Sequence, residues 1–196
     1  MFDGLRRRIF ALGMRLHRFS YRLWLATWAI ICVLFIFEPQ VEAVLQLLRY
    51  DKNFVSHFRF IENQYRFLID SGTFPDVSVA HFHMLEIAAW LAMAFASTVL
   101  LSAAVEIWIY EGPYRILYER LAAMDRKKLI GAFVLLPVMG FALSSMPAQV
   151  EAKPFFLIMK VAPRVYFLMV AVTYVVFASW SSAMLAVIGW LVVWRG

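Results

Sequence analysis

Histidines and glutamates are the residues of this sequence best suited to bind a metal or to transfer protons, and only four histidines occur among its 196 residues. His83 and Glu86 are three residues apart, so on a helix they share one face, as zinc ligands do. His81 and His83 would instead point about 200° apart on a helix. Only His57 could add a further ligand from the same side. His57, His83 and Glu86 are therefore the candidates for a metal site, but two ligands at helical spacing are too few, and we expect no bound cofactor.

Haem and quinone are the other redox groups that histidines could serve. A haem held between helices needs axial histidines inside two of them. The four histidines fall at or outside the predicted membrane interfaces, which disfavours haem. Contact with a quinone stays open, with His83 as a hydrogen-bond donor beside Phe82 and Trp90. A membrane redox subunit that uses His83, Glu86 and His57 is the alternative functional hypothesis.

The carboxylates do not form a catalytic pair. Glu86 and Glu106 are separated on a straight helix by about 30 Å of rise and about 200° of rotation, so they lie at opposite ends and on opposite faces. No serine or cysteine has a base at a recognisable spacing, and no phosphate-binding glycine loop is present. We therefore predict a non-enzymatic protein without catalytic residues.

The chain is largely apolar, since 63% of the residues are hydrophobic and only 16% are charged. Long apolar segments are therefore the elements that position these side chains. A helix that crosses about 30 Å of hydrocarbon needs about 20 apolar residues. None of the four candidates has an ionisable residue near its middle, which disfavours a pump or a coupled transporter. The sequence predicts an all-α polytopic membrane protein, a single membrane domain whose four transmembrane helices are 21–37, 84–110, 129–146 and 165–194.

Basic residues set the predicted orientation. Lys and Arg concentrate in the N-terminal arm, 1–20, and in the loop 111–128, so both termini are expected in the cytoplasm of a bacterium and the spans in its inner membrane. The segments 38–82 and 147–164 then lie outside. The arm has a helical apolar stripe between arginines, which predicts an interfacial helix on anionic headgroups. These headgroups explain the net charge of +6, so we expect no direct contact with nucleic acid.

The first span also has features of a cleavable signal peptide, since a basic arm and an apolar run precede "VEA" at Val41. We prefer an uncleaved anchor, because the arm is long and Glu38 and Pro39 separate the apolar run from the small residue. The single cysteine, Cys32, lies within this span and excludes an intrachain disulfide.

Two sets of residues are candidates for protein contacts. The segment 38–82 has apolar residues at helical spacing and is too short for a core of its own, so we expect it to be helical and to contact a partner. Small residues in the last span allow another helix to approach closely. The expected partners are other integral membrane subunits, with a second copy of the chain included. The partner contacts are predicted at Phe58, Ile61 and Tyr65, and the helix packing at Ala178, Ser182, Ala186 and Gly189.

Three stretches carry a resemblance to a known family. They are "FEPQVEAVLQLLRYDKNFVSHF" after the first span, "RILYERLAAMDRKK" before the third, and "LLPVMGFALSSMPAQVEAKPFFLI" between the last two. In this order the chain resembles the small polytopic membrane proteins that integrating conjugative elements encode among the genes of their type IV secretion machinery. The basic cytoplasmic loop of that family is reduced here to "EGPYRILYERLAAMDRKK". The resemblance implies an accessory role in conjugative transfer and carries no catalytic residues over.

Overall fold

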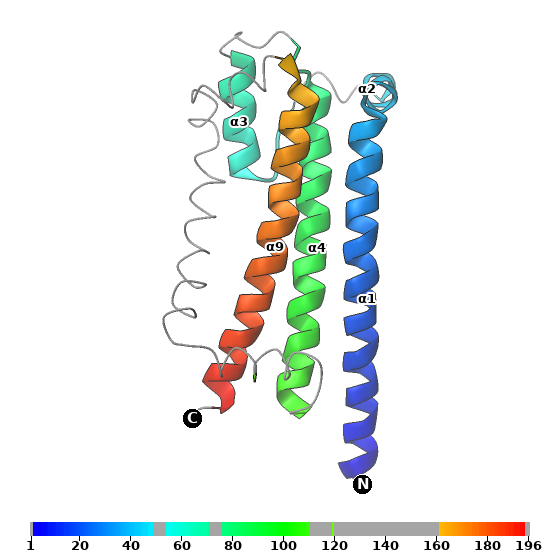
Figure 1. The fold of residues 1–196 in the computed structure, drawn as a ribbon, viewed down its shortest axis with the longest axis vertical. Coiled ribbons are helices and arrows are strands. Elements are labelled where there is room, and N and C mark those ends of the chain that lie inside the picture. Colours follow the sequence, from blue (N-terminus) through cyan, green and yellow to red (C-terminus); the bar gives the residue numbers. More distant parts are fainter. Residues whose placement is uncertain (1, 49–53, 71–75, 110–118, 120–160, 195–196) are drawn as a thin grey trace. The chain divides into compact units, whose positions relative to one another are not determined.

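The computed structural model describes residues 2–48, 54–70, 76–109, 119 and 161–194, and the regular structure in these ranges is entirely helical. The predicted all-α class is confirmed for this part of the chain. Three helices are long and apolar enough to cross a membrane, over Gly4–Ile36, Val79–Trp108 and Pro163–Gly189. Figure 1 labels the five helices: α1 (Phe2–Ile36), α2 (Glu38–Leu47), α3 (Arg59–Asp70), α4 (Val79–Ile109) and α9 (Pro163–Trp194).

Helix α1 differs from the sequence-based division into an interfacial arm, 1–20, and a span, 21–37. One uninterrupted helix of 35 residues covers both segments. The arm contains no proline, so nothing in it breaks the hydrogen-bond ladder where the polarity changes. No break in α1 separates the predicted interfacial arm from the predicted span. The predicted third span, 129–146, lies outside the described residues.

Proline determines where α1 ends and α2 begins. Pro39 has no amide hydrogen and occupies the first turn of α2, where a missing donor costs least. The amides of Gln40 and Val41 both donate to the carbonyl of Phe37, at 3.0 Å. Glu38 is thereby fixed in the first turn of α2, directly after the apolar helix.

The chain divides into two compact units, and α1, α4 and α9 each contribute a part to both. Unit 1 contains α1 up to Ala26, α4 from Ala92 and α9 from Phe177. Unit 2 contains the remaining part of each long helix together with α2 and α3.

An aromatic cluster forms the core of unit 2. The ring of Phe82 on α4 is fully buried, and its centroid lies 5.8 Å from that of Phe54, 5.1 Å from that of Tyr65 and 5.1 Å from that of Phe167. The interplanar angles to Tyr65 and Phe167 are 89° and 79°, the edge-to-face arrangement that aromatic pairs favour. Phe82 thus joins the segment before α3, α3 itself and α9.

The amphipathic pattern of α3 determines which face packs on this core. Ile61, Gln64 and Leu68 are buried and recur at helical spacing. Arg59 and Arg66 lie on the exposed side, where Arg66 forms an ion pair with Glu62 one turn away. The helical segment predicted between the first two spans is therefore present as α2 and α3.

In unit 1, α1 and α4 approach closely at a glycine. A β-carbon at Gly13 would lie 3.2 Å from Cγ1 of Val105, closer than an ordinary van der Waals contact. The Ser102 hydroxyl donates to the Gly13 carbonyl at 3.4 Å. A side chain larger than hydrogen at this position would have to move α1 or Val105.

Substitution of Gly13 by leucine is expected to lower the free energy of unfolding by about 1–3 kcal/mol through overpacking. Gly4 is a matched control, because a β-carbon there would have no heavy atom within 4 Å. Gly4→Leu is expected to leave stability unreduced. Thermal unfolding of both variants in the same detergent measures the difference, and equal losses would contradict the close approach at Gly13.

Candidate functional site

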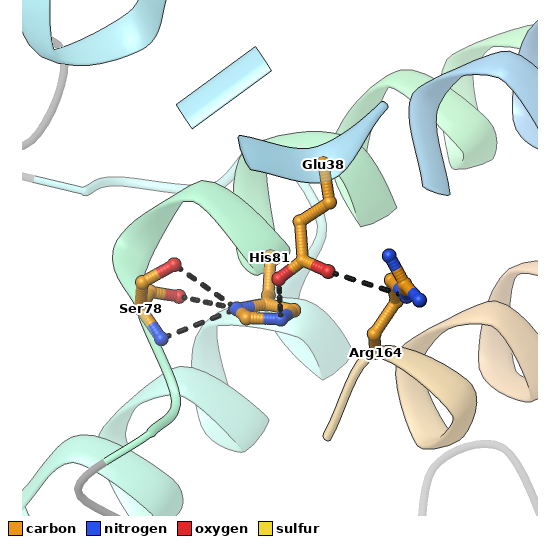
Figure 2. Close-up of polar contacts among 4 residues, drawn as sticks. All are labelled: Glu38, Ser78, His81 and Arg164. Carbon is orange, nitrogen blue, oxygen red and sulfur yellow. Dashed lines mark hydrogen bonds and ion pairs between the residues drawn. The ribbon is translucent and has the colours of Figure 1, made fainter. Parts of the chain in front are cut away.

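A cluster of polar side chains in unit 2 brings together Glu38, Ser78, His81 and Arg164, and we call it the Glu38–His81 cluster (Figure 2). Glu38 Oε1 lies 2.7 Å from Nε2 of His81, and Glu38 Oε2 lies 3.6 Å from Nε of Arg164. The three charged or ionisable residues come from α2, α4 and the start of α9. The carboxylate therefore lies between an imidazole and a guanidinium.

Three polar groups of Ser78 lie close to one ring nitrogen of His81. The Ser78 amide nitrogen, hydroxyl and carbonyl oxygen lie 3.2, 3.0 and 3.3 Å from Nδ1. Nδ1 can accept from the amide or the hydroxyl, or donate to the carbonyl, according to the tautomer of the ring. The carboxylate oxygen lies above the ring rather than along the N–H direction (Figure 2). The His81–Glu38 contact is therefore electrostatic and not a well-directed hydrogen bond.

Burial makes this contact stronger than one on an open surface. The side chain of His81 is 2% exposed and that of Glu38 is 15% exposed, while Arg164 is 52% exposed. A partly desolvated carboxylate needs a cationic or hydrogen-bonding partner. His81 on α4 and Arg164 on α9 are these partners for Glu38 on α2. The cluster therefore links the three helices, which is a structural role.

Two of the three predicted metal ligands are in contact, and the third packs against an aromatic ring. His57 and Glu86 are in contact, with Nδ1 of His57 2.7 Å and its backbone nitrogen 3.0 Å from Oε1 of Glu86. His83 instead packs against the edge of Phe54, at a ring distance of 4.9 Å. Among the described residues no group of three or more metal-ligating side chains occurs. Glu86 accordingly anchors the segment that leads into α3.

The residues predicted to contact a partner lie against the chain's own side chains. Ile61 is fully buried. Tyr65 packs on Phe82, and Phe58 packs on Trp90 at a ring distance of 5.1 Å. The apolar stripe of α3 thus faces the core of unit 2, because α4 and α9 supply aromatic side chains that the sequence pattern of α3 alone does not reveal.

The predicted helix-packing residues of α9 are in unit 1. Ala178, Ser182 and Ala186 are buried. A β-carbon at Gly189 would lie 2.9 Å from Cδ1 of Ile107 on α4. The absence of a side chain at Gly189 therefore leaves room for Ile107 of the same chain.

The Glu38–His81 cluster was not among the residues singled out in the sequence. One signal could have indicated it, since Glu38 directly follows the first predicted span, His81 precedes the second and Arg164 precedes the last. All three predicted span ends lie on the same membrane side. Oppositely charged residues at neighbouring helix ends are candidates for pairing.

A second polar contact that the sequence did not indicate joins α3 to α9. The amide nitrogen of Gln64 donates to the Tyr166 hydroxyl at 3.0 Å, and both side chains are buried. Tyr166→Phe removes the acceptor and leaves a buried amide, so the free energy of unfolding should fall by about 1–3 kcal/mol. The double variant Gln64→Leu/Tyr166→Phe should lose less than the sum of the two single losses, measured by unfolding in detergent. Additive losses would contradict this contact.

Comparison of the chain with protein families, with curated proteins and with solved structures finds no match.

Proposed function

We propose that this protein is a non-enzymatic integral membrane protein that acts as an accessory or structural subunit of a larger membrane assembly. The observation that carries this proposal is the apolar surface of α2. No residue of α2 is buried, and α2 lies outside the three candidate spans. Leu47 is 82% exposed, and Val44 and Leu48 are also exposed. An apolar surface next to, but outside, a span favours contact with another membrane subunit.

The paired polar groups support a structural rather than a catalytic role. Glu38 is positioned by His81 and Arg164, and Glu86 is bonded to His57. These contacts hold helices and connecting segments together, and none of them presents a nucleophile with a base.

Purification in a mild detergent followed by mass spectrometry tests this function. A stoichiometric integral membrane partner is expected with the unmodified chain and should be lost from Leu47→Gln/Leu48→Gln. Val55→Gln is the matched control, because Val55 is 74% exposed elsewhere in unit 2, and it should retain the partner. A monodisperse chain without a partner would overturn the proposal. Association of two copies would identify a homo-oligomer as the assembly.

The host process that we propose is conjugative DNA transfer by a type IV secretion apparatus in the bacterial inner membrane, with four spans and both termini in the cytoplasm. The resemblance of the three quoted stretches supports the process, and the distribution of Lys and Arg supports the orientation. Transfer frequency in a deletion strain tests the process. If the deletion leaves the transfer frequency unchanged under conditions in which the parent strain expresses the protein, the proposed process is contradicted.

A redox subunit is the second candidate, favoured by the contact of His57 with Glu86 beside an aromatic ring. The centroids of His57 and Trp90 lie 5.8 Å apart. A quinone carbonyl could accept a hydrogen bond from this imidazole while the quinone ring packs on the indole. Optical spectra, metal analysis and the effect of His57→Ala on electron transfer decide this hypothesis, and no change in any of them would remove it.

A further inference from the structure

Gln64 on α3 is a polar side chain in the core of unit 2. It is 1% exposed and lies between Ile61 and Leu68 on the buried face of α3. Its amide nitrogen donates to the Tyr166 hydroxyl, whereas its carbonyl oxygen Oε1 has no hydrogen-bond partner in the described part of the chain. Buried carbonyl oxygens in folded proteins nearly always accept a hydrogen bond, from the protein or from an ordered water. A donor is therefore expected at Oε1.

The Tyr166 hydroxyl has the complementary deficit. Its side chain is 2% exposed, and within the described residues its only hydrogen bond is the one that it accepts from Gln64. A tyrosine hydroxyl also carries one O–H donor, which usually finds an acceptor when the side chain is buried. Among the described residues, the contact between α3 and α9 thus leaves one acceptor on Gln64 and one donor on Tyr166 to be satisfied.

A water molecule satisfies both groups, because it donates and accepts. It can donate to Oε1 of Gln64 and accept from the O–H group of Tyr166, and a buried water commonly makes two to four such bonds. Exchange of the amide oxygen and nitrogen would direct the Tyr166 O–H group to the oxygen and place two N–H donors at the present position of Oε1. Water serves this arrangement too, since it accepts from an N–H group. A metal cation could serve only the acceptor, and an anion only the donor.

The position of the two residues along the chain places them near water. Helix α3 lies outside the three candidate spans, and Tyr166 is the fourth residue of the span Pro163–Gly189. The contact is therefore at the end of a span and not in the middle of the hydrocarbon, where no water is present to satisfy polar groups.

We propose that Gln64 and Tyr166 bind one water molecule in the core of unit 2, between α3 and α9. The water adds a second polar link between the two helices, beside the direct hydrogen bond of 3.0 Å. A hydrogen bond through an ordered water is nearly as favourable in enthalpy as a direct one. This inference does not depend on the identity of the assembly.

Radiolytic footprinting of the full chain in detergent, read by peptide mass spectrometry, tests the site. An X-ray pulse splits water into hydroxyl radicals wherever the water lies, including inside a protein, and the radicals oxidise the nearest aromatic rings. The pulse should oxidise Tyr166 but not Phe35, whose ring is equally buried at 2% exposure. Radicals generated only in the bulk solvent, by photolysis of hydrogen peroxide, should oxidise neither ring.

Gln64→Leu removes one of the two groups that bind the water and should abolish the X-ray oxidation of Tyr166. Gln46→Leu, the same substitution at an exposed position of α2, should preserve it. Circular dichroism establishes that both variants remain helical, and retained oxidation in helical Gln64→Leu would overturn the site. Oxidation of Tyr166 no faster than that of Phe35, or equal oxidation by bulk radicals, would overturn it in the unmodified protein, even if Gln64→Leu failed to fold.

Discussion

Glu38→Ala is expected to lower the free energy of unfolding by about 1–3 kcal/mol, because it removes the polar partner of the buried His81 imidazole and one partner of Arg164. His81, at 2% exposure, cannot turn to water, and Arg164 loses the carboxylate at 3.6 Å. Unfolding in detergent, followed by circular dichroism, measures the loss. Glu38→Gln should lose less, because the amide keeps an oxygen next to the imidazole.

Glu62 provides the control for a carboxylate outside the cluster. Its partner, Arg66, is one turn away on α3 and is largely exposed. Exposed pairs of this kind contribute about 0–1 kcal/mol, so Glu62→Ala should have a small effect. Similar losses for Glu38→Ala and Glu62→Ala would show that the Glu38–His81 cluster does not hold unit 2 together.

Phe82→Ala is the second substitution with a large expected effect, about 3–5 kcal/mol for removal of a fully buried aromatic ring. The ring of Phe82 contacts those of Phe54, Tyr65 and Phe167, so its loss leaves a cavity among three separate segments. We expect α3 to detach before the long helices unfold. Hydrogen exchange should then be faster in α3 than in α4.

Trp90→Ala is the matched control on the same helix. Trp90 is 48% exposed, and its ring contacts those of Phe58 and His57. A cost near that of an ordinary surface substitution is expected. If Trp90→Ala released α3 as completely as Phe82→Ala, the core of unit 2 would not lie around Phe82.

The membrane-like helices could be predicted from the sequence, whereas the continuity of α1 could not. Hydropathy separates a basic arm from an apolar span because it measures side-chain polarity. The hydrogen-bond ladder of a helix depends instead on backbone amides and is interrupted by proline, which first occurs at Pro39. The change of polarity after residue 20 is consequently not a structural boundary.

The candidate site could be predicted only in part, because spacing rules apply within one helix. These rules placed His83 and Glu86 on one face of a helix. Glu86 instead contacts His57, which lies in the segment before α3. The pairing of Glu38 with His81 likewise depends on how separate helices pack. The stripe with Ile61 was recognised as apolar, while its burial became visible only with the aromatic residues of α4 and α9.

The Glu38–His81 cluster also has a consequence for biosynthesis. Glu38 and His81 emerge from the ribosome before Arg164, so the carboxylate and the imidazole can meet first and the guanidinium joins only when α9 is made. A chain that stops before α9 would lack Tyr166 and Phe167, and it would expose Gln64 on α3 and Phe82 on α4, which these residues contact. Such a nascent chain would be more open to proteases than the finished protein, so the cluster couples resistance to degradation to completed synthesis.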